Sequence, residues 1–135
     1  MKNTQKILGI IALMAVMALL MTACSLDGGQ SLSLNGDWVT TGGTYDIRIS
    51  GNTGVFTKLN PGGPFYSAGA RVGDQFLRYI TQTGERTWSA DAQYYSTPSY
   101  TLGWSRVTIT MSENGKSLHV TSGTTADMTV SFARK

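Results

Sequence analysis

The stretch WSRVTITMSENGKSLHVT, residues 104–121, indicates the fold more clearly than any other part of this 135-residue chain. Val107 and Ile109 alternate with polar residues, which is the period of two expected of a half-buried strand. Asn114-Gly115 then forms a strong two-residue hairpin signal, because both residue types accept a positive φ. Apolar and polar residues alternate again after this turn. The stretch therefore predicts a β-hairpin.

Similar segments, separated by short turns rich in Gly, Asn and Ser, fill the chain from Gly36 to Lys135. No apolar stripe at helical spacing persists among them. The predicted strands are Asp37–Thr41, Tyr45–Ser50, Val55–Leu59, Phe65–Arg71, Gln75–Thr81, Arg86–Tyr95, Trp104–Ser112, Ser117–Thr121 and Asp127–Arg134. Eight or nine short strands at regular spacing predict an all-β domain. We expect a small antiparallel up-and-down barrel, with a β-sandwich as the alternative.

Residues 1–23 have the three-part build of an export signal. Lys2 and Lys6 precede the apolar segment 7–21, which is shorter than the roughly 20 residues that span a bilayer. The string Met21-Thr22-Ala23-Cys24 then resembles the lipobox of bacterial lipoproteins, with Met21 where Leu is usual. The resemblance implies cleavage before Cys24 and lipid modification of its side chain.

Lipidation of Cys24 predicts a protein anchored to a membrane by its acyl chains. Ser25 stands where the inner-membrane retention Asp of many enteric lipoproteins lies, which favours the outer membrane within the cell envelope. Residues 24–35 are polar and aperiodic and predict a flexible tether, so the folded domain is expected over 36–135. Cys24 is the only cysteine, so no disulfide framework is available and the core must hold by packing.

The charge distribution argues against nucleic acid as a partner. The formal net charge of +3 includes Lys2 and Lys6, and their removal with the signal leaves the mature chain nearly neutral. The remaining basic residues are scattered singly among nearly as many acids, and no basic stripe is present to neutralise a run of phosphates. No feature of the sequence indicates an oligomeric state.

The string Gly36-Asp37-Trp38 resembles the G-x-W motif of the calycins, the group of barrels that includes the lipocalins. In lipocalins this Trp closes one end of the barrel, and an Arg from the last strand packs over its ring. Arg134 ends the final predicted strand and matches that position. The resemblance implies a lipocalin-like barrel in which Trp38 and Arg134 form a structural cation–π pair.

Residue types suited to catalysis are sparse. His119 is the only histidine, and it alternates with Leu118 and Val120, which places it on the solvent face of a strand. The acids fall largely at turns or strand edges, and nothing singles out a partner for Asp91. We therefore expect no catalytic residue, no metal site and no cofactor, and a protein that is not an enzyme.

The aromatic residues are the remaining indication of function. Trp88 and Tyr94 share one face of a predicted strand with Ala90 and Ala92, a pattern that suits either a partly open cavity or a filled core. The candidate ligand-binding residues are Trp88, Tyr94, Tyr79 and Trp104. We expect an envelope lipoprotein that binds a small hydrophobic or amphipathic ligand. The alternative is a structural or interaction module with a filled core, whose loops contact another envelope component or a glycan.

Overall fold

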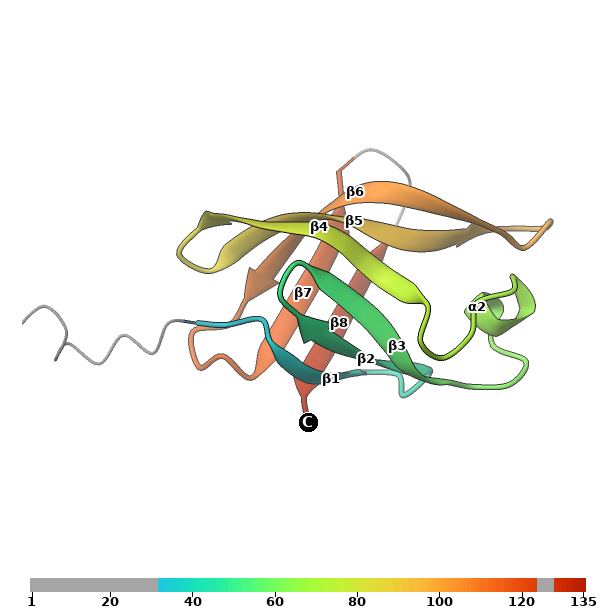
Figure 1. Cartoon of the computed structure of the whole chain (residues 1–135), viewed down its shortest axis with the longest axis horizontal. Coiled ribbons are helices and arrows are strands. Elements are labelled where there is room, and N and C mark those ends of the chain that lie inside the picture. The colour runs from blue at the N-terminus through green and yellow to red at the C-terminus, as the bar shows by residue number, and fades with distance from the viewer. Residues whose placement is uncertain (1–31, 124–127) are drawn as a thin grey trace, which may run out of the picture. The chain divides into compact units, whose positions relative to one another are not determined.

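Eight antiparallel strands close into a barrel in the computed structural model, which describes residues 32–123 and 128–135 (Figure 1). Each strand pairs with its neighbours in sequence, and β1 pairs with β8 to complete the ring. The strands are β1 (Gly36–Thr40), β2 (Tyr45–Ser50), β3 (Thr53–Leu59), β4 (Gln75–Gly84), β5 (Thr87–Ser96), β6 (Thr101–Met111), β7 (Ser117–Ser122) and β8 (Thr129–Arg134). The predicted up-and-down barrel is confirmed. The sandwich alternative is wrong, because the sheet closes on itself.

The predicted signal peptide, Cys24 and the predicted tether as far as residue 31 lie outside the described residues. Ser33–Lys135 forms one compact unit. Because this unit has a closed sheet and its own hydrophobic core, it meets the requirements of a domain that folds by itself.

The core is built from the inward-facing side chains of the strands. Along β2, Tyr45, Ile47 and Ile49 are buried while Arg48 and Ser50 are exposed, which is the alternation that the sequence predicts. The largest fully buried side chains are Trp38, Phe56, Phe76, Phe132, Ile47, Ile49, Leu77, Ile109, Met111 and Leu118. They come from seven of the eight strands, so the interior of the barrel beneath its open end is packed rather than hollow.

Trp38 is buried at the end of the barrel where the chain enters it. Its indole Nε1 donates a hydrogen bond to the Leu34 carbonyl at 2.8 Å, and the guanidinium carbon of Arg134 lies 4.3 Å from the centre of its ring. The cation–π contact expected between Trp38 and Arg134 is therefore present. The two residues are also directly paired between β1 and β8.

The segment before β1 is part of this closed end. Leu34 is buried, and the Arg134 guanidinium donates to the carbonyls of Ser33 at 2.8 Å and Asn35 at 2.9 Å. Residues 33–35, which the sequence assigns to the tether, thus pack against the barrel. A polar and aperiodic composition did not reveal this, because backbone carbonyls form these bonds and leave no pattern in the sequence.

Gly36, the glycine of the G-x-W motif, has a specific reason to lack a side chain. Its φ is +135°, a value that other residues rarely adopt. A Cβ there would also lie 2.9 Å from Nη1 of Arg134. Arg134 has little room to move, since it is held by hydrogen bonds to three backbone carbonyls. The glycine lets the guanidinium lie across the start of β1.

The prediction of a strand at Phe65–Arg71 is wrong, because the short helix α2 (Pro64–Ser67) occupies the first part of this segment. Pro64 occupies the first turn, where its fixed φ favours a helix. Its missing N–H costs no hydrogen bond there, because the first N–H groups of a helix have no partner within the helix. Gly69 follows with φ +102° and turns the chain away. The helix buries Phe65, and aromatic content alone does not distinguish this arrangement from a strand.

Strands β4 and β6 extend further than the sequence predicts, whereas β5 is shifted by one residue. β4 continues to Gly84, where the predicted strand ends at Thr81, and β6 begins at Thr101, where the predicted strand begins at Trp104. The β5–β6 hairpin is paired without interruption from Thr87 and Thr110 to Ser96 and Thr101. Cross-strand hydrogen bonds lengthen these strands, and local turn signals do not indicate them.

Candidate ligand-binding cavity

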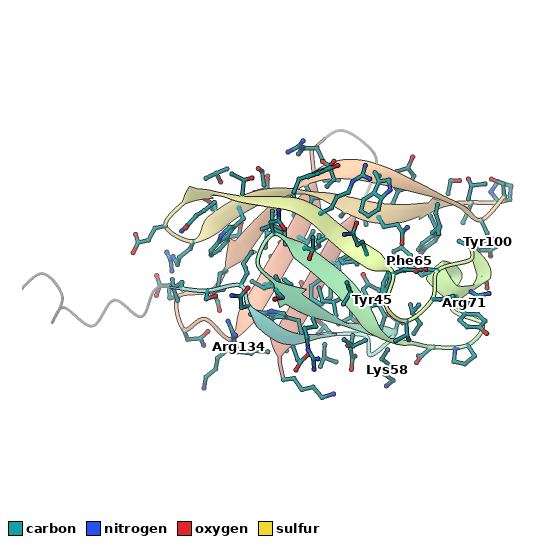
Figure 2. All side chains as sticks on the ribbon, viewed as in Figure 1. Tyr45, Lys58, Phe65, Arg71, Tyr100 and Arg134 are labelled. Atoms are coloured by element: carbon teal, nitrogen blue, oxygen red, sulfur yellow. The ribbon has the colours of Figure 1, made fainter. Side chains whose placement is uncertain are left out.

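A cavity of about 690 Å³ opens at the end of the barrel opposite Arg134. Strand β1 runs from one end of the barrel to the other. It begins at Gly36, beside Arg134, and ends at Thr40, which lines the cavity. In Figure 2, Arg134 lies away from Tyr45 and Phe65, which belong to the cavity end. The aromatic and aliphatic lining residues are Tyr45, Phe65, Tyr66, Tyr94, Tyr95, Leu59, Pro64, Met128 and Val130.

Tyr45 connects the cavity with the packed core. Its ring makes edge-on or tilted contacts with Phe56, Phe65, Phe76 and Phe132, at centroid distances of 5.2 to 5.9 Å. These are favourable aromatic geometries, and they fix the position of the ring. Tyr45 therefore forms a rigid inner wall of the cavity rather than a side chain free to swing into it.

Among the described residues that line the cavity, the Tyr45 hydroxyl is a fully buried polar group without a hydrogen-bond partner. The residue is only 6 % exposed, and its Oη has no hydrogen-bond partner among the described residues. Burial, with a further contribution from the nearby Tyr95 phenol, raises the pKa of Tyr45 well above its usual value, so the group stays protonated. It is therefore an O–H group that can donate or accept one more hydrogen bond.

Helix α2 covers one side of the cavity through Phe65. The Phe65 ring lies 5.2 Å from the ring of Tyr45 and 5.0 Å from that of Tyr95, both at steep interplanar angles. This contact joins the β3–β4 connection to β2 and β5. The short helix thus contributes an aromatic wall that no strand supplies.

The Tyr94 ring forms another part of the wall, and Gly103 makes room for it. The two residues are paired between β5 and β6, and a Cβ on Gly103 would lie 2.7 Å from the ring carbon that bears the Tyr94 hydroxyl. Any larger residue at 103 would push this ring aside. The position of Tyr94 therefore depends on a glycine in the neighbouring strand.

Threonine and serine residues surround the apolar wall, and the structure already uses some of their hydroxyl groups. Thr40 Oγ1 donates to the Tyr45 carbonyl at 2.9 Å and accepts from the Thr44 backbone N–H at 3.1 Å. These bonds hold the β1–β2 turn in place at the cavity edge. The other polar lining residues are Thr41, Thr44, Asn60, Ser105, Thr129 and Ser131.

Within the described part of the chain, the cavity lining contains no acidic residue, no lysine, no arginine and no histidine. Arg71, which Figure 2 labels beside α2, is engaged elsewhere. Its guanidinium lies 4.4 Å from the Tyr66 ring centre and donates to the carbonyls of Tyr66 and Ala70. As far as residues 32–123 and 128–135 line it, the cavity is thus aromatic and polar without a charged side chain.

Of the four aromatic residues proposed from the sequence, only Tyr94 lines the cavity. Trp88 faces the interior as predicted, together with Ala90 and Ala92, but it is buried in the core and paired with Ile109. Tyr79 is 61 % exposed. Its φ of +55° interrupts β4 where the pairing with β5 shifts, so the alternation of the strand does not place it inside.

Trp104 lies on the outer face of the barrel, not in the cavity. It stands three positions before the buried Val107, and in a strand residues an odd number of positions apart lie on opposite faces. The guanidinium carbon of Arg78 lies 3.9 Å from its ring centre. Asp91 stands nearby and pairs with Arg106 at 3.0 Å and with Arg78 at 3.7 Å.

His119 also lies on the outer surface, as its alternation predicts. Its Nδ1 is 2.9 Å from the Ser131 hydroxyl across the β7–β8 pair. Among the described residues, no group of three or more His, Cys, Asp or Glu side chains is placed to hold a metal ion. No helix within residues 32–123 and 128–135 is long and apolar enough to cross a bilayer.

Sequence reasoning missed Tyr45, Phe65 and Tyr95 as cavity residues. Tyr45 was detectable in part, because it shares the inward face of β2 with Ile47 and Ile49 and lies at the end of that strand. Phe65 was not, since the helix that presents it was predicted as a strand.

Comparisons of the chain with models of known protein families, with curated proteins and with solved structures found no match.

Proposed function

We propose that this protein is a lipid-anchored component of the bacterial cell envelope whose barrel binds a small apolar or amphipathic ligand. The observation that supports binding is the cavity of about 690 Å³ at the open end. Sites for small molecules usually measure roughly 300–1,000 Å³ and are lined mainly by apolar and aromatic side chains with a few polar groups. Tyr45, Phe65, Tyr94 and Tyr95 form such a wall, and threonine and serine residues lie around it.

The packing of the barrel between the Arg134 end and the cavity supports the same proposal. The Trp38–Arg134 contact and the segment 33–35 close one end, and Phe56, Phe76 and Phe132 pack together in the middle. A ligand therefore enters by the end that bears α2, away from the point where the chain joins the barrel. This separation allows the anchor and the binding site to act independently.

The envelope location rests on the sequence alone. The lipobox-like string ending at Cys24 supports lipidation, and Ser25 supports the outer membrane. The structure leaves residues 25–32 between Cys24 and the first residue of the packed unit.

The test of the binding function is native mass spectrometry of the segment from Ser25 onward, purified from its own host without detergent. We expect a co-purified small molecule, and its loss when the cavity is filled by Val130→Trp, since Val130 shares the inward face of β8 with Phe132. Thr108→Trp, on the exposed face of β6, is the matched control and should keep the adduct. Absence of any adduct, together with no change in tryptophan fluorescence on adding apolar probes, contradicts the proposal.

A further inference from the structure

The outer face of β4, β5 and β6 carries a row of three charged side chains. These strands are neighbours in the sheet (Figure 1), and their register places Asp91 opposite both Arg78 and Arg106. Nε of Arg106 lies 3.0 Å from one carboxylate oxygen of Asp91, and Nε of Arg78 lies 3.7 Å from the other. The Asp91 side chain is only 18 % exposed, whereas that of Arg106 is 62 % exposed. The charge that this row presents to solvent is therefore mainly positive.

Two aromatic rings adjoin the row. The guanidinium carbon of Arg78 lies 3.9 Å from the ring centre of Trp104 and 5.2 Å from that of Tyr79. Both distances suit a cation–π contact, so Trp104 and Asp91 together hold Arg78 in place. Tyr79 is 61 % exposed although Arg78 lies over its ring, so the other side of the ring is open to solvent. We call Arg78, Tyr79, Asp91, Trp104 and Arg106 the outer cluster.

Tyr79 reaches this position through an unfavourable backbone conformation. Its φ of +55°, which few residues other than glycine adopt, occurs within β4 where the pairing with β5 shifts between Arg78 and Thr81. Such irregularities redirect side chains and are frequent at functional sites. The exposed ring gains little from burial, so hydrophobic packing does not account for the strain. Contact with a ligand on the outer face accounts for it.

An exposed aromatic ring beside fixed planar polar groups is suited to a sugar. The face of the ring is negative and attracts the polarised C–H groups on one side of a sugar. Guanidinium and carboxylate groups held on a rigid sheet supply donors and acceptors for its hydroxyl groups. The exposed guanidinium of Arg106 also favours an acidic substituent, because its planar fork matches the geometry of a carboxylate or a similar oxyanion.

We propose that the outer cluster binds an acidic polysaccharide, with Tyr79 stacked on a sugar ring and Arg106 paired with an acidic group of the chain. This site is separate from the cavity, because the residues of the cluster lie outside the cavity lining. The inference therefore does not depend on the apolar ligand of the cavity, and its failure would leave that function standing.

Binding of the segment from Ser25 onward to immobilised polymers tests the inference by biolayer interferometry. Polygalacturonate and dextran sulfate are the acidic probes, and fully methyl-esterified polygalacturonate and dextran are their uncharged counterparts. Poly-L-glutamate supplies carboxylates without sugar rings. We expect an acidic polysaccharide to bind about tenfold more tightly than its uncharged counterpart and than poly-L-glutamate.

Two variants assign this binding to the outer cluster. Arg106→Gln should weaken it about tenfold through the loss of a charge-assisted contact, and Arg86→Gln, at another surface ion pair, is the matched control. Tyr79→Asn removes the ring, and asparagine tolerates a positive φ, so binding should fall about tenfold while Tm stays equal or rises. Tyr100→Asn is its control, because Tyr100 is also exposed, with φ +47°. Both controls should bind like the wild type.

The proposal is wrong if neither acidic polysaccharide binds, or if poly-L-glutamate binds as tightly as they do. It is also wrong if Arg106→Gln and Tyr79→Asn bind like the wild type. A lower Tm of Tyr79→Asn together with weaker binding would show that the ring supports the fold, and would overturn its stacking role. Charge-selective binding that both variants weaken, with both controls unchanged, supports the proposal.

Discussion

The Arg134 guanidinium stacks on the Trp38 ring at 4.3 Å and at the same time donates hydrogen bonds to the carbonyls of Gly115, Asn35 and Ser33. One side chain thereby joins the last strand, the first strand, the β6–β7 turn and the segment before β1. These elements are far apart in sequence. Arg134 therefore closes the end of the barrel at which the predicted tether joins it.

Replacement of this arginine should destabilise the fold. Arg134→Met keeps much of the apolar stem but removes the cation–π contact and three hydrogen bonds, so we expect a loss of about 2–3 kcal/mol in the free energy of unfolding. Urea denaturation measures it. Arg86→Met, which removes a surface pair with the exposed Glu113, should cost at most about 1 kcal/mol. Equal effects of the two variants would contradict the closing role of Arg134.

Gly36→Ala should also destabilise the closed end, by roughly 1–2 kcal/mol, because alanine is strained at φ +135° and its Cβ meets Nη1 of Arg134. Thermal unfolding of the variant measures the loss. Gly42→Ala offers a control, since a Cβ there meets no atom within 4 Å. If part of the loss comes from the clash, the double variant Gly36→Ala with Arg134→Met will lose less than the two single variants combined.

The Asp37–Arg48 pair should make stability depend on pH in the acid range. The Arg48 guanidinium donates two hydrogen bonds to the Asp37 carboxylate, at 2.7 and 3.1 Å, and these bonds lower the pKa of Asp37. Because the folded-state pKa lies below the unfolded value of about 3.9, the stabilisation is present above that pH and is lost as the pH falls further.

The measurement is the difference in Tm between the wild type and Asp37→Asn. We expect the wild type to be more stable at neutral pH, and the difference to shrink toward zero near pH 2. High salt at neutral pH should reduce it as well, because both groups are exposed. A difference that stays constant across the pH range would show that the ion pair is not its cause.

Tyr45 should make the stability of the fold decrease as the pH rises in the alkaline range. Burial raises its folded-state pKa above the unfolded value of about 10. The native state therefore holds the proton more tightly, so the stabilisation of the protonated group is complete below about pH 10 and is lost as the pH rises beyond it.

Tyr45→Phe removes this dependence together with the unpaired hydroxyl. We expect the variant to unfold at a urea concentration equal to or above that of the wild type at pH 8, and the gap to widen in its favour at pH 11. Tyr100→Phe, at an exposed tyrosine, should leave the pH profile of the wild type unchanged. A gap that does not change between the two pH values would contradict the assignment.

The envelope anchor is tested in the full-length protein expressed in a bacterial host. Cys24→Ser should abolish both the incorporation of labelled fatty acid and the recovery of the protein in membranes, because the acyl chains have no other predicted attachment point. Ser25→Asp in an enteric host should keep the label and move the protein to the inner-membrane fraction. Labelling and membrane recovery that persist in Cys24→Ser would contradict lipidation at this residue.

The sequence by itself determined the all-β class, the inward faces of β2 and β5, and the contact of Trp38 with Arg134. Alternation and turn chemistry are local, so Ile47, Trp88 and Asn114-Gly115 reveal their roles through their immediate neighbours. The Trp38–Arg134 contact was predicted because a resemblance to a known motif supplied the distant partner. The lipid anchor at Cys24 likewise remains a prediction from sequence.

Tertiary structure alone decided where the cavity lies and which residues line it. Tyr45, Phe65 and Tyr95 come from three elements, and their meeting depends on barrel closure and on a helix that Pro64 begins where a strand was predicted. Tyr79 turns outward because a register shift breaks the alternation of β4. A cavity is a void between segments that are distant in sequence, and no local pattern encodes it. That the Tyr45 hydroxyl has no hydrogen-bond partner likewise depends on the side chains that surround it in the folded protein.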